Sequence, residues 1–405
     1  MQVYTARHDP SRCFDETLPG GAFGVRVRGA WLPRHVLGGR CHALCAALRC
    51  AWLALCVAFE LAGALDAVLC DQVAAMLPVL RVLLALRSVP AVFYCHFPDL
   101  LLASHGTLAR RLYRAPMDCL EEVSTGCASA VLVNSEFTAS VFNRTFGGLR
   151  RAGVRPRVLY PAVDLEVHAP PTSSAKKAEV ERHLPEGVLG GDDAARGGGS
   201  SGGGGGVDRT APALLVSLNR FERKKGLGVA IEALAELGRR RGQQGLHDVR
   251  LCLAGGYDPA LQENVEHLDE LKALAKAAGV AHAVTFVPNF SAMQRRALLS
   301  RCVAVVYTPQ DEHFGIVPLE AMAAARPVVA CASGGPRETV VDSRTGYLCE
   351  PTAAAFADAL ERLLDEPAAA RAMGAAARAH VAAKFSKHEF GRRLEEELEL
   401  ARRRR

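Results

Sequence analysis

The chain has 405 residues, which is more than one ordinary domain and predicts two. Its formal net charge of +6 owes most to the four arginines at the end, so we expect no nucleic-acid partner. Thirteen cysteines are scattered without the spacing of metal ligands. We therefore expect reduced thiols that serve as small apolar residues, and no bound metal.

Short apolar runs alternate with longer helical stretches in the first 165 residues. Strands are predicted at residues 3–6, 26–32, 67–69, 91–95 and 130–133. Helices are predicted at residues 40–62, 73–86, 111–128 and 137–146. Alternation of this kind indicates an α/β domain with a parallel, doubly wound sheet.

The predicted helix at residues 40–62 is unusually apolar. Between Arg49 and Glu60 lie ten uncharged residues, fewer than the roughly 20 that a helix needs to span a bilayer. A helix that is apolar on nearly all sides must be buried somewhere, so three interpretations stay open. It is a core helix, a helix on a membrane surface, or a membrane span. Residues 73–86 could share the same membrane face.

Two polar residues follow predicted strands of this half. His96 comes directly after residues 91–95, at the edge of the sheet where ligands bind in α/β folds. It either holds its loop by hydrogen bonds or orients, or takes a proton from, a ligand hydroxyl. Ser135 follows residues 130–133, and we interpret it as the N-cap of the next helix only.

Residues 171–212 interrupt the pattern. They contain the run GGGSSGGGGG at residues 197–206 and a charged run at residues 176–182. Such a composition cannot form a core, so we expect a flexible linker or an inserted loop between two α/β halves.

The second half again alternates. Strands are predicted at residues 214–218, 251–256, 284–288, 302–307 and 327–332. Helices are expected around residues 270–278, at residues 292–300 after the cap Ser291, and from Pro318 onward. The last segment, residues 386–405, is helical and could pack back on the other domain.

Basic residues follow the first strand of this half. Arg220 and Lys225 lie five positions apart in one loop, and a guanidinium and an ammonium together suit two adjacent phosphates. By itself the loop could equally be a solvated basic turn. The pair Gly334 and Gly335 allows close approach of the backbone to a ligand, although such pairs are also common in turns.

The stretch at residues 308–320 is central to the functional prediction. Pro318 suits the first position of a helix, which places Glu312 in a strand-to-helix loop and Glu320 in the first helical turn. A helix N-terminus favours an anionic ligand, and two carboxylates beside it can bind hydroxyl groups. The stretch therefore predicts a polyhydroxylated ligand that carries phosphate.

Three features of the second half resemble glycosyltransferase family 4. They are the spacing of Glu312 and Glu320, the R-x4-K-G pattern from Arg220 to Gly226, and residues 334–348. Five segments in order are similar to its mannosyltransferases of dolichol-linked oligosaccharide assembly: FYCHFPDLLL, RLYRAP, NSEFTASVF, NRFERKKG and EHFGIVPLEAM. The resemblance covers about residues 3–165 and 213–385. It implies the GT-B fold, with two Rossmann-like doubly wound domains facing a central cleft.

The resemblance also implies an activity. Such enzymes transfer mannose with retention from GDP-mannose to Man1GlcNAc2-diphosphodolichol, first α-1,3 and then α-1,6, in N-glycan precursor assembly. The expected place is the cytosolic face of the endoplasmic reticulum membrane, beside other enzymes of the pathway. GDP-mannose is then a substrate, and no metal or other cofactor is expected. Residues 1–165 would form the acceptor-side domain, 166–212 a Gly/Ser-rich linker or insertion, 213–385 the GDP-mannose domain, and 386–405 a C-terminal helix with a basic tail.

The resemblance gives each candidate residue a role. Arg220 and Lys225 would neutralise the leaving diphosphate, Glu312 would hold donor-sugar hydroxyls, and Glu320 would hold the ribose. His96 would lie near the sugar and the acceptor. Donor binding is further assigned to four residues after Glu312, namely Phe314, Gly315, Ile316 and Val317.

The beginning of the chain departs from the family pattern. Family members open with a buried strand and a glycine-rich loop, whereas MQVYTARHDP resembles their second strand. We therefore expect about one further strand–loop–helix unit upstream. Two other functions stay open: a family 4 transferase with a different nucleotide sugar or acceptor, and an inactive scaffold at a membrane.

Overall fold

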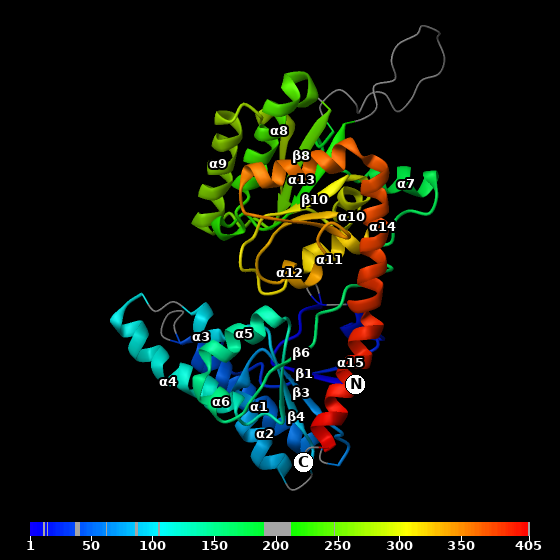
Figure 1. Ribbon diagram of the computed structural model, residues 1–405. Coiled ribbons are helices and arrows are strands. Elements are labelled where there is room, and N and C mark those ends of the chain that lie inside the picture. Colours follow the sequence, from blue (N-terminus) through cyan, green and yellow to red (C-terminus); the bar gives the residue numbers. More distant parts are fainter. Residues whose placement is uncertain are drawn as a thin grey trace. The chain divides into compact units, whose positions relative to one another are not determined.

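The computed structural model describes residues 1–10, 13, 15–36, 41–61, 63–85, 88–103, 106–189, 212–246 and 248–403. The chain forms two compact units (Figure 1). One consists of Met1–Tyr160 and Phe390–Arg405, and the other of Pro161–Glu389. Both contain parallel strands joined through helices, which confirms the expected α/β class with two Rossmann-like domains. The glycine-rich run at residues 197–206 lies outside the described residues.

The N-terminal unit has two parallel sheets. One pairs β1 (Gln2–Thr5) with β2 (Gly24–Val27). The other has the order β3-β4-β5-β6 and consists of β3 (Val68–Asp71), β4 (Ala91–Cys95), β5 (Ala130–Val133) and β6 (Arg157–Val158). The strand predicted at residues 26–32 ends early, because Gly29 has a φ of +79° and turns the chain after Arg28.

The helices of this unit largely follow the predictions. They are α1 (His42–Glu60), α2 (Leu77–Leu84), α3 (Asp99–Leu102), α4 (Leu108–Thr125), α5 (Glu136–Thr145) and α6 (Gly147–Arg151). The predicted helix at residues 73–86 is instead a 3-10 turn, η3 (Ala74–Met76), followed by α2. The N-cap predicted at Ser135 is confirmed, since its hydroxyl accepts a hydrogen bond from the backbone N–H of Thr138 at 2.9 Å.

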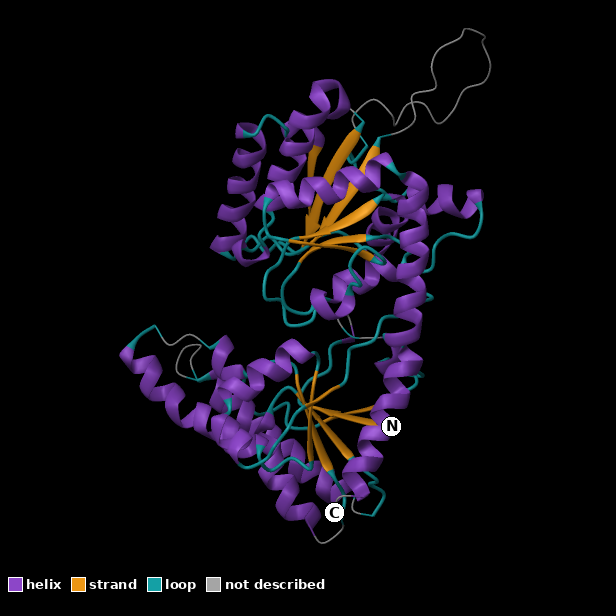
Figure 2. Ribbon diagram, in the orientation of Figure 1, coloured by secondary structure: helices purple, strands orange, loops and turns teal. Residues whose placement is uncertain are grey.

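The C-terminal unit is built on one parallel sheet, whose strands are drawn in orange in Figure 2. It has six strands in the order β12-β11-β10-β7-β8-β9. The strands are β7 (Ala213–Leu218), β8 (Val249–Gly255), β9 (Val284–Pro288), β10 (Ala304–Tyr307), β11 (Val328–Cys331) and β12 (Gly346–Cys349). Consecutive residues of β7, whose side chains point to opposite faces of the sheet, are both fully buried, as Leu214 and Leu215 show. The sheet is therefore covered on both faces, as parallel sheets require.

Helices provide this cover. They are α8 (Gly228–Leu246), α9 (Gln262–Ala277), α10 (Ala292–Arg301), α11 (Ile316–Ala323), α12 (Pro336–Thr339), α13 (Ala353–Asp365) and α14 (Pro367–Lys384). The side chains of α8, α9 and α13 share one buried cluster with the strands. The predicted cap of α10 is confirmed, because Ser291 and Gln294 form a reciprocal capping box.

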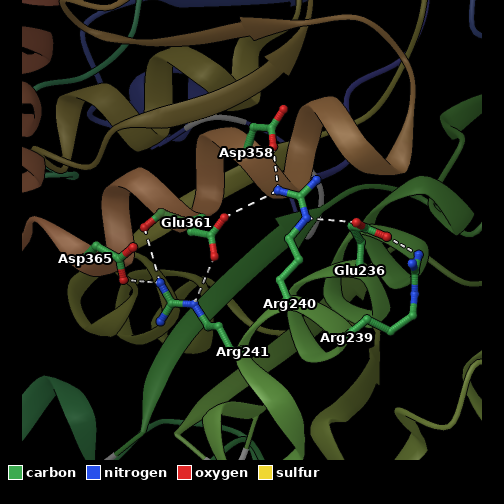
Figure 3. A network of polar contacts seen from close by, with 7 residues as sticks. All are labelled: Glu236, Arg239, Arg240, Arg241, Asp358, Glu361 and Asp365. Carbon is green, nitrogen blue, oxygen red and sulfur yellow. Dashed lines mark hydrogen bonds and ion pairs between the residues drawn. The ribbon is translucent and has the colours of Figure 1, made fainter.

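Ion pairs join α8 to α13 across the surface of this unit (Figure 3). Arg240 contacts Asp358 at 2.5 Å and Glu361 at 3.4 Å, while Glu236 of its own helix holds it from the other side at 2.8 Å. Arg241 contacts Glu361 and Asp365. Because these pairs are solvent-exposed, we interpret them as fixing helix register rather than supplying much stability.

The first part of residues 166–212, which were predicted to be a linker or an insertion, folds onto the C-terminal unit. Helix α7 (Ser174–Glu181) begins at the N-cap Ser173. The side chains of Val180 and Val188 are buried, and the Thr285 hydroxyl donates to the carbonyl of Gly187 at 3.0 Å. The sequence did not predict the burial of these two valines, because isolated apolar residues in a polar and charged segment form no recognisable pattern.

The C-terminal helix α15 (Lys387–Arg403) confirms the expectation that the last segment packs on the other domain. Ala401 is fully buried beside Tyr94 and Leu132 of the N-terminal sheet. Partly buried Phe390, Leu394 and Leu398 extend this contact. An ion pair between Arg157 of β6 and Glu397 accompanies it.

Candidate active site

The candidate donor site lies at the carboxyl ends of three neighbouring strands, β7, β10 and β11. The loops that follow these strands carry the basic pair, the first glutamate and the glycine pair, respectively. In open α/β sheets this edge is the usual place of ligand binding. The order of strands therefore brings together three motifs that are far apart in the sequence.

The closest contact in this site joins Lys225 to Glu312. The Lys225 ammonium lies 2.5 Å from Oε2 of Glu312, with only 11% and 23% of the two side chains exposed. The Thr308 hydroxyl donates to the carbonyl of Lys225 at 2.7 Å, which ties the two loops together. Burial and the neighbouring Glu312 carboxylate raise the pKa of Tyr307 far above its ordinary value, so this phenol stays neutral and hydrogen-bonds to Glu312.

The glycine pair is required by contact between two loops of the protein. The N–H of Gly335 donates to the carbonyl of Glu312 at 2.8 Å. A Cβ atom on Gly334 would collide with the backbone of Glu312, and one on Gly335 with the backbone of Phe314. The close backbone approach that we predicted toward a ligand is thus made toward the loop of Glu312, which it holds in place.

Helix α11 begins at Ile316, two residues before the predicted start at Pro318. The reason is Gly315, whose φ of +81° turns the chain into the helix and whose position leaves a Cβ only 3.2 Å from the Tyr307 hydroxyl. Glu320 is therefore in the second helical turn, and its prediction in the first turn is wrong.

The four residues assigned to donor binding after Glu312 are not equivalent. The Phe314 side chain is buried and its ring centroid lies 6.2 Å from that of Phe385. Ile316 is exposed, and Val317 is partly buried. Gly315 and Ile316, with Val317, form the entrance to α11, so their backbone N–H groups are free of intrahelical partners. Phe314 supports this turn from the core.

Glu320 is held by a residue that the sequence did not reveal. Its Oε1 lies 2.6 Å from the guanidinium of Arg295 in α10. Its Oε2 is buried and has no hydrogen-bond partner among the described residues. Burial raises the pKa of Glu320, and the charge of Arg295 opposes the rise. An unpaired buried acceptor of this kind fits a hydroxyl donor such as a ribose.

The two residues of the basic pair, Arg220 and Lys225, form ion pairs with different carboxylates. Arg220 is 60% exposed and forms an ion pair at 2.7 Å with Glu222, a residue of its own loop. Lys224 contacts the other oxygen of Glu222 at 3.1 Å. Lys225 alone of this loop faces Glu312. Because Arg220 is the exposed member of this pair and ion pairs at the surface are weak, its guanidinium can exchange Glu222 for an anionic ligand.

His96 lies in the N-terminal unit, directly after β4. Its Nε2 is 2.8 Å from Oδ1 of Asp71, the last residue of β3. The aspartate was missed by sequence reasoning, although both residues follow predicted strands. That shared position is the signal that could have found it.

The comparisons with known proteins first define a class. Residues 207–380 match the family model "Glycosyl transferases group 1". A solved glycosyltransferase from Rickettsia africae ESF-5 superposes with a TM-score of 0.67 at 14% identity, covering 99% of this chain and 89% of that one. The fold is therefore that of the GT-B glycosyltransferases.

Full-length relatives then define the particular family. The chain is 43% identical to the human protein "Alpha-1,3/1,6-mannosyltransferase ALG2" over 97% of its length and 87% of that protein. It is 38% identical to the Dictyostelium discoideum protein of the same name, over 97% and 89%. The chain belongs to the ALG2 family of alpha-1,3/1,6-mannosyltransferases.

Replacing Arg295 with methionine should destabilise the C-terminal unit in a pH-dependent way. Without Arg295 the pKa of Glu320 rises further. The pKa of this carboxyl is then higher in the folded protein than in the unfolded protein. The unfolded protein therefore loses the proton first, and the free energy of unfolding falls as the pH rises above the ordinary carboxyl pKa of about 4.3. Because Arg295 is partly exposed, we expect a loss of about 1–3 kcal/mol at pH 8 and a smaller one at pH 5.

Denaturant unfolding at both pH values measures this effect. Arg296→Met is the matched control, because Arg296 is an exposed neighbour on the same helix. Equal losses at pH 5 and pH 8, or no loss, would show that Arg295 does not compensate Glu320.

Proposed function

We propose that the protein is a retaining mannosyltransferase that uses GDP-mannose to extend Man1GlcNAc2-diphosphodolichol, first through an α-1,3 and then through an α-1,6 linkage. The proposal rests on the partly buried Lys225–Glu312 pair at the ligand edge of the sheet, in a chain similar over nearly its whole length to alpha-1,3/1,6-mannosyltransferases. Donor, acceptor and the order of linkages are part of the proposal. Other enzymes of the pathway are proposed neighbours.

The C-terminal unit supplies groups for the leaving nucleotide. Departure of GDP develops negative charge on the β-phosphate, and preorganised cations lower the energy of that state. Lys225 is held in place by Glu312 before any ligand arrives, so little reorganisation is needed. Arg220, weakly paired at the surface, can add a second positive charge. We propose that these cations replace a metal ion, so that a chelator leaves the rate unchanged.

The two glutamates suit different hydroxyl groups. One oxygen of Glu312 is committed to Lys225, and the carboxylate has further lone pairs that can accept from donor-sugar hydroxyls. The unpaired Oε2 of Glu320 can accept from a ribose hydroxyl. In the N-terminal unit we assign His96 to a sugar hydroxyl. This division leaves no charged candidate residue without a role.

Glu312→Gln should nearly abolish transfer while the protein stays folded. The amide keeps the size of the side chain but removes the charge that holds Lys225, and losing one such electrostatic group costs roughly two to three orders of magnitude in rate. The assay follows radiolabelled mannose from GDP-mannose to a synthetic Man1GlcNAc2-diphosphate lipid, with linkage analysis of the product.

Glu232→Gln is the control for this variant, since Glu232 is an exposed residue on α8. Wild-type turnover by Glu312→Gln would remove Glu312 from the site. Absence of an α-1,3-linked product from the wild-type protein would contradict the proposed acceptor chemistry.

A membrane-surface role for α1 is supported by its two unlike faces. Leu53, Ala54 and Val57 pack in the core of the N-terminal unit. Leu44, Leu48, Trp52 and Phe59 form an exposed apolar stripe at helical spacing. Among the described helices, α1 is also the one whose length and composition would allow a membrane span. Because one face is committed to the core, we favour contact with the membrane surface, on the cytosolic face of the endoplasmic reticulum.

The double variant Leu48→Gln with Phe59→Gln should lose membrane binding. Burying a large apolar side chain contributes about 1.5–3 kcal/mol, so removal of two should weaken binding to phosphatidylcholine–phosphatidylinositol vesicles at least tenfold in a sedimentation assay. Leu261→Gln is the control, because Leu261 is an exposed apolar residue of the C-terminal unit and lies outside both α1 and residues 73–86. Equal binding by all three proteins would exclude the stripe as the contact.

A further inference from the structure

Asp71 and His96 meet at the ligand edge of the N-terminal sheet. Asp71 ends β3 and lies opposite Tyr94 of the neighbouring parallel strand β4. His96 follows β4 by one residue, so both side chains leave the sheet at the same edge. The Oδ1–Nε2 distance of 2.8 Å is that of a direct hydrogen bond.

The imidazole is also held by an aromatic contact. Its ring centroid lies 4.7 Å from that of Tyr94, with the two planes at 89°. Tyr94 is itself buried, and its hydroxyl donates to the carbonyl of Leu159 at 2.8 Å. Two partners from adjacent strands therefore restrict the ring of His96, although 41% of this side chain is exposed.

The chemistry of the pair selects one tautomer. An ionised carboxylate can only accept hydrogen bonds, so the proton between the two residues belongs to Nε2. In a neutral imidazole the other nitrogen, Nδ1, then carries a lone pair and accepts. Among the described residues Nδ1 has no hydrogen-bond partner. It is therefore available to a group that donates a proton, such as a hydroxyl.

We propose that Asp71 is a positioning residue that fixes His96 in the Nε2–H tautomer, so that Nδ1 accepts a hydrogen bond from a hydroxyl of the sugar substrate. The inference rests on the proposed transfer of a sugar and specifies the atom that meets it. Asp71 acts only through His96. It is distinct from the groups of the C-terminal unit that serve the leaving nucleotide.

Asp71→Asn tests the tautomer directly. An amide can present either its oxygen or its N–H₂ group to Nε2, so the variant permits both tautomers of His96. In long-range 1H–15N spectra of the full chain with 15N-labelled histidine, wild-type His96 should show the Nε2–H signature. Asp71→Asn should show a mixture of tautomers. The signals are assigned by their loss in His96→Gln.

The same variant should lower turnover with little change in the KM for GDP-mannose. Removing a group that orients a histidine typically costs about 10- to 100-fold, as known for metal-bound histidines. Asp71→Glu, which restores a carboxylate, should recover part of the rate and the single tautomer. Asp66→Asn is the control, since Asp66 is an exposed residue just before β3.

Two results would overturn the inference. One is an unchanged His96 tautomer in Asp71→Asn, and the other is a wild-type turnover number in that variant. Because 66% of the Asp71 side chain is exposed, the substitution should not unfold the protein, and thermal unfolding checks this. The spectra do not depend on transfer, so failure of this inference is distinguishable from failure of the proposed function.

Discussion

The ion pair between Lys225 and Glu312 is the contact on which the candidate donor site depends. It joins a loop after β7 to a loop after β10, strands that are neighbours in the sheet although their loops are more than eighty residues apart. A buried charge is tolerated only when it is paired. Each partner therefore fixes the other, and the bond from Thr308 to Lys225 holds the two loops together. The bond from Gly335, in the loop after β11, holds the loop of Glu312.

This arrangement has a functional consequence. A preformed cation needs no rearrangement when negative charge develops on a leaving group, and this makes electrostatic stabilisation effective. The pair of Arg220 with Glu222 differs from this preformed pair, because the Arg220 side chain is 60% exposed and can leave Glu222 for a ligand. The site thus combines one fixed positive charge with one that can move to a ligand.

Much of the fold was predictable because parallel strands are buried on both faces. The runs at residues 91–95, 130–133 and 284–288 agree with β4, β5 and β9 to the residue. The sequence likewise placed Glu312 in the loop between a strand and a helix, which are β10 and α11 in the structure. Contacts made by single side chains were not predictable. Arg295 has no sequence pattern that identifies Glu320 as its partner, and the start of α11 depends on the backbone conformation of Gly315. For Asp71 the sequence shows only that it follows a predicted strand, as His96 does, and not that the two side chains are bonded.

The most direct test of the Lys225–Glu312 account is calorimetric titration of Lys225→Ala with GDP. A hydrogen bond to a charged group contributes about 1.5–3 kcal/mol, and the variant also leaves Glu312 as an uncompensated negative charge, so GDP should bind at least tenfold more weakly than to the wild-type protein. Lys224→Ala, which changes the exposed neighbouring lysine, should bind GDP like the wild type. Unchanged GDP affinity in Lys225→Ala, or an equal loss in both variants, would contradict the assignment of Lys225 to the diphosphate.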